Sequence, residues 1–188
     1  MKTTTLITPD GPFSVVVAAV AAGDGGPVRG VGLSADETRE QVLAAGWTDD
    51  VDSLLALVHP TLRPGGDVRD TNPTGLLAEA ADAVRAYYDG DHGAPGRVPV
   101  LQASGPYRTH AWDVLREVKA GERLTYSEYA ARTGRPAAVR AAAGACAMNA
   151  AALFVPCHRI LRTDGTLGGF RYGLPIKESL LARESLTA

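Results

Sequence analysis

The sequence predicts an α+β (or α/β) protein with a small N-terminal sheet-and-helix domain, followed by a mostly helical C-terminal domain that contains a winged-helix-like helix-turn-helix. Two observations support this prediction. Short β-rich runs separated by proline and glycine turns are frequent in residues 1–103, whereas residues 104–188 contain successive helical patterns. A chain of 188 residues is also long enough for one large domain or two small ones. We therefore expect a structural domain at 1–103 and a functional domain at 104–188.

Three strands are expected first. Thr3–Thr8 and Phe13–Ala22 are β-rich and flank a turn at Pro9–Pro12. A second turn, Gly23–Pro27, precedes a third predicted strand at Val28–Leu33. These elements predict a small sheet.

The next elements are expected to be helices. Ser34 is a good N-cap with Glu37 three residues later, and this pattern predicts a helix that runs to about Ala45. The short apolar run Val51–Val58 favours a helix over a strand. Pro60–Thr74 is rich in proline, glycine and aspartate and is expected to be a loop.

An amphipathic helix is predicted at Thr74–Tyr88, where apolar residues recur at helical spacing. A polar, glycine-rich segment follows, and Val98–Leu101 is expected to form a last short strand. This half therefore resembles a small sheet with helices packed on it. It contains no recognisable catalytic constellation.

Helical patterns dominate from residue 107 onward. Trp112 lies on the apolar face of a helix that is expected to end at Gly121. Thr125 and Glu128 have capping-box spacing, so a second helix is predicted from there to Gly134.

The following helix, Ala137–Met148, is composed almost entirely of small residues and carries one long charged side chain, Arg140. Pro136 stands where a first helical residue is expected, so the two helices and their short connection predict a helix-turn-helix. Small residues often indicate tight packing in a core. A buried helix rarely carries an unpaired arginine, however. A helix that approaches DNA closely and projects Arg140 explains both observations.

The chain is expected to end with a loop and a helix. Thr163–Gly169 has the residues of a hairpin loop, and Phe170–Gly173 is an aromatic and basic tetrad. Ile176–Glu184 is predicted to form a closing helix, with Leu180 and Leu181 facing inward.

Charge is distributed unevenly along the chain. Residues 1–105 contain 7 Lys/Arg and 14 Asp/Glu, a net charge of −7, and residues 106–188 contain 12 Lys/Arg and 7 Asp/Glu, a net charge of +5, which together give −2. A basic half suggests contact with nucleic acid, although a charge of this size is also compatible with an ordinary solvated surface.

The two cysteines, Cys146 and Cys157, form neither a CxxC motif nor a zinc pattern, so a reducing, cytoplasmic compartment is expected. The apolar run Ser14–Ala22 resembles the apolar core of a signal peptide. The Pro9–Pro12 turn, however, lies where the N-terminal basic region of such a peptide should meet its apolar core, so a turn between two strands is favoured. No apolar run is long enough to suggest a transmembrane helix.

The heptapeptide Phe154–Ile160 contains a candidate nucleophile, because Cys157 is followed directly by His158. A free cysteine is often a small buried hydrophobe. Next to a hydrogen-bonding or cationic group, it can instead be a nucleophile. Such a thiol needs a base, and the base needs an orienting group. His158 and Glu184 are candidates for these two roles.

These motifs resemble the methylated-DNA–protein-cysteine methyltransferases, the O6-alkylguanine-DNA alkyltransferases. The resemblance covers residues 104–188 strongly and extends thinly to the strand and turn at Thr8–Phe13. Segments 145–149 and 164–167 are most similar to the C-terminal half of the bacterial adaptive-response protein. The matching residues and motifs are Tyr126, Arg140, Asn149, Pro156-Cys157-His158-Arg159, Gly169-Phe170-Arg171-Tyr172-Gly173 and Glu184.

The resemblance implies that Cys157 would attack the alkyl carbon on guanine O6 in a single displacement. His158 would take the thiol proton through a water, and Glu184 would orient His158. Tyr126 would donate a proton to the guanine ring nitrogen. Asn149 would order the turn that links the recognition helix to the cysteine.

The resemblance also implies a partner, double-stranded DNA that contains O6-alkylguanine, and neither a cofactor nor a metal. Arg140 would fill the space of a flipped nucleotide. The residues that would touch the DNA backbone are Tyr107, Ser127, Arg135 and Thr163. The residues that would line the base pocket are Cys146, Ile160, Phe170 and Arg171.

The sequence departs from the family pattern at Lys119 and Val139, and at the alanines 150–152. None of these changes removes a chemical group that the mechanism needs. The predicted function is therefore irreversible, single-turnover repair by a monomer. The alternatives are an alkyltransferase-like DNA damage sensor, which would lack the cysteine, and a cysteine hydrolase, which would turn over through an acyl-enzyme.

Overall fold

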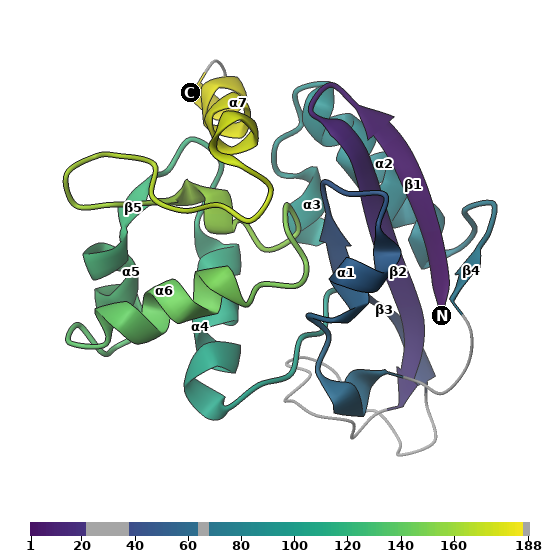
Figure 1. Cartoon of the computed structure of the whole chain (residues 1–188), viewed down its shortest axis with the longest axis horizontal. Coiled ribbons are helices and arrows are strands. Elements are labelled where there is room, and N and C mark those ends of the chain that lie inside the picture. Colours follow the sequence, from purple (N-terminus) through teal and green to yellow (C-terminus); the bar gives the residue numbers. More distant parts are fainter. Residues whose placement is uncertain (22–37, 64–67, 186–188) are drawn as a thin grey trace.

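The computed structural model describes residues 1–21, 38–63 and 68–185 (Figure 1). Its N-terminal half contains a four-stranded sheet in the order β3-β2-β1-β4. β1 (Lys2–Thr8) and β2 (Gly11–Ala21) form an antiparallel hairpin, as predicted. β2 also pairs with β3 (Thr38–Gly46), and the short β4 (Arg69–Asp70) lies parallel to β1. The predicted strand at Val28–Leu33 lies outside the described residues.

The predicted helix up to Ala45 is wrong in its described part, which is strand β3. Val42 and Ala45 pack in one cluster of buried residues, and Leu43 and Ala44 pack in another, on the opposite face of the sheet. A strand that is buried on both faces shows no period-two alternation in its sequence. Pairing with β2 therefore outweighs the local capping signal.

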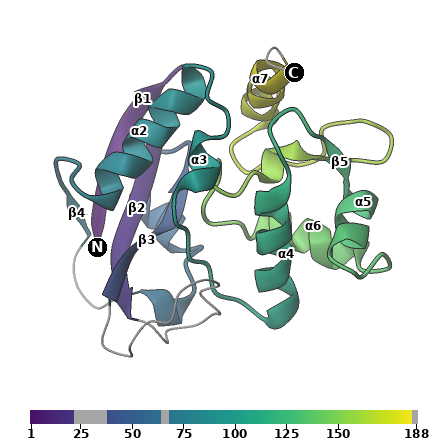
Figure 2. The ribbon, with the colours of Figure 1, turned by 180° about the vertical axis from the view of Figure 1, so that it is seen from behind.

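Helices cover both faces of this sheet. α2 (Leu76–Tyr88) packs against β1, β2 and β3 on one face, which confirms the predicted amphipathic helix (Figure 2). α1 (Val51–Leu55) and a 3-10 turn, η1 (Pro60–Leu62), cover the other face. The helix predicted over Val51–Val58 is thus confirmed but shorter, and the predicted loop after it contains η1 and β4.

The C-terminal half is mostly helical, as predicted, and lies beside the sheet (Figures 1 and 2). A short helix, α3 (Ala94–Arg97), leads into it. Its further elements are α4 (Pro106–Glu117), β5 (Leu124–Thr125), α5 (Tyr126–Arg132), α6 (Val139–Ala147), the 3-10 turn η2 (Cys157–Arg159), β6 (Ile160–Leu161) and α7 (Leu174–Ser185). No helix of the described ranges is long and apolar enough to cross a membrane.

The connection between α5 and α6 follows the predicted capping in part. The capping box of Thr125 and Glu128 is present, and Gly134 has a φ of 75°, which favours glycine. Pro136 does not begin the next helix, because a turn closed by Ala138 N donating to Arg135 O precedes α6, and Ala138 becomes its N-cap. α5 and α6 pack against each other.

The edge of β3 joins the two halves through backbone hydrogen bonds. Ala45 N donates to Ala150 O (2.8 Å), and Ala152 N donates to Ala45 O (2.9 Å). The strand predicted at Val98–Leu101 forms only a one-residue bridge, between Val100 and Val42. Pro99 has no N–H with which to extend that pairing.

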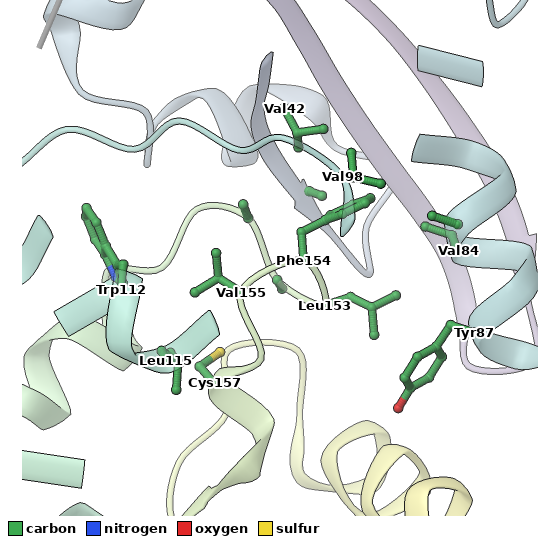
Figure 3. Close-up of a cluster of buried hydrophobic side chains, with 14 of the residues drawn as sticks. Val42, Val84, Tyr87, Val98, Trp112, Leu115, Leu153, Phe154, Val155 and Cys157 are labelled. Carbon is green, nitrogen blue, oxygen red and sulfur yellow. The ribbon is translucent and has the colours of Figure 1, made fainter. Parts of the chain in front are cut away.

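The segment before the cysteine lies in the core between the halves. Leu153, Phe154 and Val155 are buried in one cluster with residues of both halves (Figure 3). Leu153 has a φ of 72°, a conformation that only surrounding packing maintains in a residue of this type. The core therefore fixes the backbone that leads to Cys157.

Candidate active site

Cys157 begins η2 and is buried, with 9% of its surface exposed. Its Sγ accepts a hydrogen bond from Asn149 Nδ2 (3.2 Å), and the same amide nitrogen donates to Val155 O (2.8 Å). Asn149 Oδ1 accepts from Gln102 Nε2 (3.0 Å) and from Ala151 N (3.1 Å). Asn149 thus links the end of α6 to the thiol and has a partner for each of its polar atoms.

His158 and Glu184 form a buried pair, in which His158 Nε2 lies 2.8 Å from Glu184 Oε1. The exposed fraction of the surface is 0% for His158 and 2% for Glu184. The structure brings together a base and the orienting carboxylate that the sequence suggested. Burial alone would raise the pKa of Glu184, but the hydrogen bonds and charges of His158 and Arg159 outweigh it and hold that pKa well below its usual range.

The imidazole of His158 is neutral at rest. Burial lowers its pKa, and Glu184 opposes that effect only in part. Because Glu184 is ionised, Nε2 carries the proton that it donates to the carboxylate. Nδ1 therefore has a free lone pair, and it is buried without a hydrogen-bond partner among the described residues. This atom can accept a proton.

Arg159 is a member of this network that the sequence analysis gave no role, although it stands in the same tetrapeptide as Cys157. Its Nε and Nη2 atoms donate to the two oxygens of Glu184 at 3.0 and 2.8 Å, and Nη1 donates to Val118 O at 2.5 Å. A buried carboxylate needs such a partner, because desolvation of an unpaired charge is costly.

Cys157 opens into a cavity of about 420 Å³. It is lined by Tyr126, Ala143, Cys146, Ala147, Asn149, Ala152, Cys157, Gly169, Phe170, Arg171 and Tyr172. Of the predicted pocket residues, Cys146, Phe170 and Arg171 therefore line it. Ile160 does not, because its side chain is fully buried in the core.

Several lining residues were missed by the sequence analysis. Ala143, Ala147 and Ala152 carry no reactive group that could have singled them out. For the two alanines of α6, the run of small residues in that helix was the one available signal, because it indicated a close approach to another molecule. Tyr172 lies in the aromatic and basic tetrad Phe170–Gly173. The centroid of its ring lies 5.5 Å from the ring centroid of Trp47 in the N-terminal half.

Burial favours the neutral forms of the thiol of Cys157 and the phenol of Tyr126, which both line the cavity. Burial raises the pKa of Cys157, and the hydrogen bond from Asn149 and the charges of Lys177 and Arg171 offset this only in part. Burial raises the pKa of Tyr126 to about 12, with Cys146 and Cys157 nearby. The thiol therefore requires a base, and the phenol remains a proton donor at neutral pH.

The predicted DNA-contacting residues lie at the surface of the C-terminal half. Arg140 is exposed and shares a face of α6 with Ala143 and Ala147, at i, i+3 and i+7, and these two alanines line the cavity. Ser127, Arg135 and Thr163 are also exposed. Tyr107 is half-buried, and the guanidinium of Arg135 lies 5.6 Å from the centre of its ring.

Comparisons with known proteins agree with this arrangement. The family model of the 6-O-methylguanine DNA methyltransferase DNA-binding domain matches residues 106–186. The Escherichia coli bifunctional transcriptional activator/DNA repair enzyme Ada is 46% identical over 91 residues, 48% of this chain, which spans only 26% of the length of Ada. Mycobacterium tuberculosis OGT, solved in complex with DNA, has a TM-score of 0.69 at 21% identity and covers 100% of this chain and 95% of its own, so the fold is shared.

Longer matches cover three quarters of the chain. The methylated-DNA–protein-cysteine methyltransferase of Shigella flexneri is 32% identical over 143 residues, which cover 75% of this chain and 81% of that protein. The relative from Methanothermobacter thermautotrophicus is 33% identical over 143 residues, 75% of this chain and 78% of its own. A match of 143 residues is longer than either half, so each includes parts of both halves. The chain therefore belongs to the methylated-DNA–protein-cysteine methyltransferase family.

Proposed function

We propose that this protein repairs double-stranded DNA by transferring the alkyl (methyl) group of O6-alkylguanine irreversibly to Cys157. The observation that carries the proposal is a buried thiol at the wall of a cavity of about 420 Å³, next in sequence to the neutral imidazole of a His158–Glu184 pair. A single displacement needs a nucleophile, a base and an orienting group, and all three are assembled here.

The first step is removal of the thiol proton. Cys157 is protonated at rest because burial raises its pKa. His158 Nδ1 takes this proton through a water, and Glu184 stabilises the imidazolium that forms. Asn149 donates to the sulfur and holds it in place as negative charge develops.

The second step is the transfer itself. The sulfur electron pair forms a bond to the alkyl carbon while the bond from that carbon to guanine O6 breaks. The leaving base gains a proton on its ring nitrogen from Tyr126, whose raised pKa keeps it protonated. The imidazolium of His158 then loses its proton to solvent, and the phenolate of Tyr126 regains one from solvent. In net terms, guanine therefore gains one proton and the thiol loses one. The thioether is stable, so each molecule acts once.

DNA binding relies on the exposed face of α5, α6 and the loop after β6. The target base must leave the stack to enter the cavity, at a cost of about a few kcal/mol. Arg140 offsets part of that cost by occupying the vacated space. The backbone contacts are assigned to Tyr107, Ser127, Arg135 and Thr163. Because such contacts displace counterions, binding weakens as salt increases. The protein acts as a cytoplasmic monomer.

Intact mass spectrometry tests the proposal directly. Incubation with a duplex that carries O6-methylguanine should add one methyl group per protein molecule, without turnover. A duplex with unmodified guanine is the matched control and should add nothing. If DNA binds but the mass does not change, the protein is a damage sensor of the alkyltransferase-like class.

A further inference from the structure

A tyrosine of the N-terminal half contacts the buried pair of the active site. Tyr87, in α2, is fully buried, and its Oη lies 3.0 Å from Glu184 Oε1. The same oxygen accepts the hydrogen bond from His158 Nε2. Figure 3 shows the hydroxyl of Tyr87 directed toward α7, the helix that carries Glu184. The contact joins residues that are 97 positions apart in the chain.

The chemistry of this contact is unambiguous. Burial, and next the charge of Glu184, raise the pKa of Tyr87 far above its ordinary value, so the phenol stays protonated. Its proton is therefore donated to the carboxylate. Leu180 O lies at 3.5 Å from the same hydroxyl and is the weaker acceptor.

We propose that Tyr87 is a positioning residue for alkyl transfer, one that fixes Glu184 Oε1 and limits the negative charge which this oxygen presents to His158. The inference rests on the proposed function. It assigns the N-terminal half a part in the reaction besides supporting the fold.

The neighbouring groups set the expected effect. Glu184 faces His158 and Arg159 of η2, Tyr87 of α2 and the backbone N–H of Gly121. Lys177 of α7 acts on His158 through its charge, and the rings of Tyr88 and His92 contact Tyr87. Three side chains thus donate hydrogen bonds to Oε1. Each donor reduces the negative charge of this oxygen that is available to the other two.

Loss of one donor should strengthen the bond from Glu184 to His158. The pKa of the imidazole then rises, because hydrogen bonding and charge favour its protonated form. His158 must be neutral to accept the thiol proton, so the acidic limb of the rate profile moves to higher pH. In this variant, Arg159 and His158 still donate hydrogen bonds to the carboxylate of Glu184, so its buried charge remains paired and the fold should be retained.

Tyr88 offers a matched control on the same helix. Its hydroxyl donates to Asp10 Oδ2 (2.8 Å) and accepts from Trp47 Nε1 (2.9 Å). Tyr88→Phe therefore removes one phenolic hydroxyl of the N-terminal half without removing a hydrogen bond to Glu184. A purely structural role of these tyrosines would affect both variants alike.

The experiment measures single-turnover methyl transfer from an O6-methylguanine duplex across about pH 5 to 8. Tyr87→Phe should shift the acidic midpoint upward by on the order of half a pH unit and slow transfer below it several-fold, with unchanged affinity for duplex DNA. Tyr88→Phe should follow the wild-type profile. Superimposable profiles for Tyr87→Phe and wild type, or equal shifts in both variants, overturn the inference.

Two further readouts separate other failures. If the wild-type protein transfers no methyl group, the proposed function fails before Tyr87 is tested. If Tyr87→Phe does not fold, proton NMR of the wild type decides: the Tyr87 hydroxyl proton should be protected from exchange and lie near Glu184. A hydroxyl proton that exchanges as freely as those of exposed tyrosines overturns the inference.

Discussion

The two halves of the molecule bury different kinds of residue. Among the described residues, the buried Arg, Lys, Asp and Glu residues are Arg159, Lys177 and Glu184, which all lie in the C-terminal half. The buried polar residues of the N-terminal half are Thr3, Thr4, Ser14 and His92. The N-terminal half contains paired strands with apolar side chains on both faces, and helices cover them. It can therefore act as a rigid wall for a half in which each buried charge needs a placed partner.

The contacts between the halves are of three kinds. The backbone of Ala45 pairs with residues 150 and 152, and the ring of Trp47 packs against Phe170 and Tyr172. Side-chain hydrogen bonds are the third kind, and two of them reach the site: Gln102 donates to Asn149 Oδ1, and Tyr87 donates to the carboxylate of the reactive pair. The acidic half therefore supports the chemistry mainly through shape, and also through these two polar contacts.

The largest effect should come from Cys157→Ala, which removes the nucleophile of the C-terminal half. We expect methyl transfer to be lost entirely and duplex binding to be retained, because none of the predicted DNA contacts is changed. Mass spectrometry of wild-type peptides after reaction should place the methyl group on Cys157. A methyl group on Cys146 would contradict the assignment.

Glu184→Gln should be next in size. It keeps the shape of the side chain but removes the charge that orients His158, so transfer should slow by about 10²-fold or more. Glu178→Gln, on the exposed side of the same helix, is the matched control and should leave the rate unchanged. Equal rates for the two variants would show that the pair does not act in the reaction.

The same substitution should change the dependence of stability on pH. The folded pKa of Glu184 is depressed, so its contribution to the free energy of unfolding is present above the unfolded value of about 4.3 and is lost as pH falls below it. Urea unfolding at neutral and acidic pH should show a large gap between wild type and Glu184→Gln that narrows in acid. A gap independent of pH would contradict the charge state assigned here.

Arg140→Ala tests whether the basic half alone engages the duplex. We expect transfer from duplex DNA to slow by about 10-fold, because no side chain then fills the space that the flipped nucleotide leaves in the duplex. Transfer from the isolated base should be unchanged. Arg85→Ala, an exposed arginine of α2 in the acidic half, is the matched control. A duplex rate unaffected by Arg140→Ala would refute the role assigned to this side chain.

The smallest effect should come from Trp47→Phe, at the wall between the halves. It removes the hydrogen bond to Tyr88 and part of the packing against Tyr172, at a cost of about 1–3 kcal/mol in the free energy of unfolding. Chemical unfolding checks this value. A slowed transfer rate with unchanged stability would instead mean that the wall shapes the cavity.

Local signals in the sequence predicted elements of both halves. The capping box at Thr125, the amphipathic helix ending at Tyr88 and the closing helix depend on residues three or four positions apart, and the structure contains all three. The signal at Ser34 failed over the described part of its range, because β3 is defined by pairing with β2, which no local pattern records.

The sequence, through its motifs and the family that they resemble, predicted Cys157 as the reactive group and His158 and Glu184 as its partners. Only the tertiary structure decided that Arg159 and Tyr87 converge on the same carboxylate, and that Ile160 belongs to the core and not to the cavity. The physical reason is distance along the chain. Burial and hydrogen-bond partners are set by packing between segments that lie up to 97 positions apart, whereas residue types and spacings report only on neighbours.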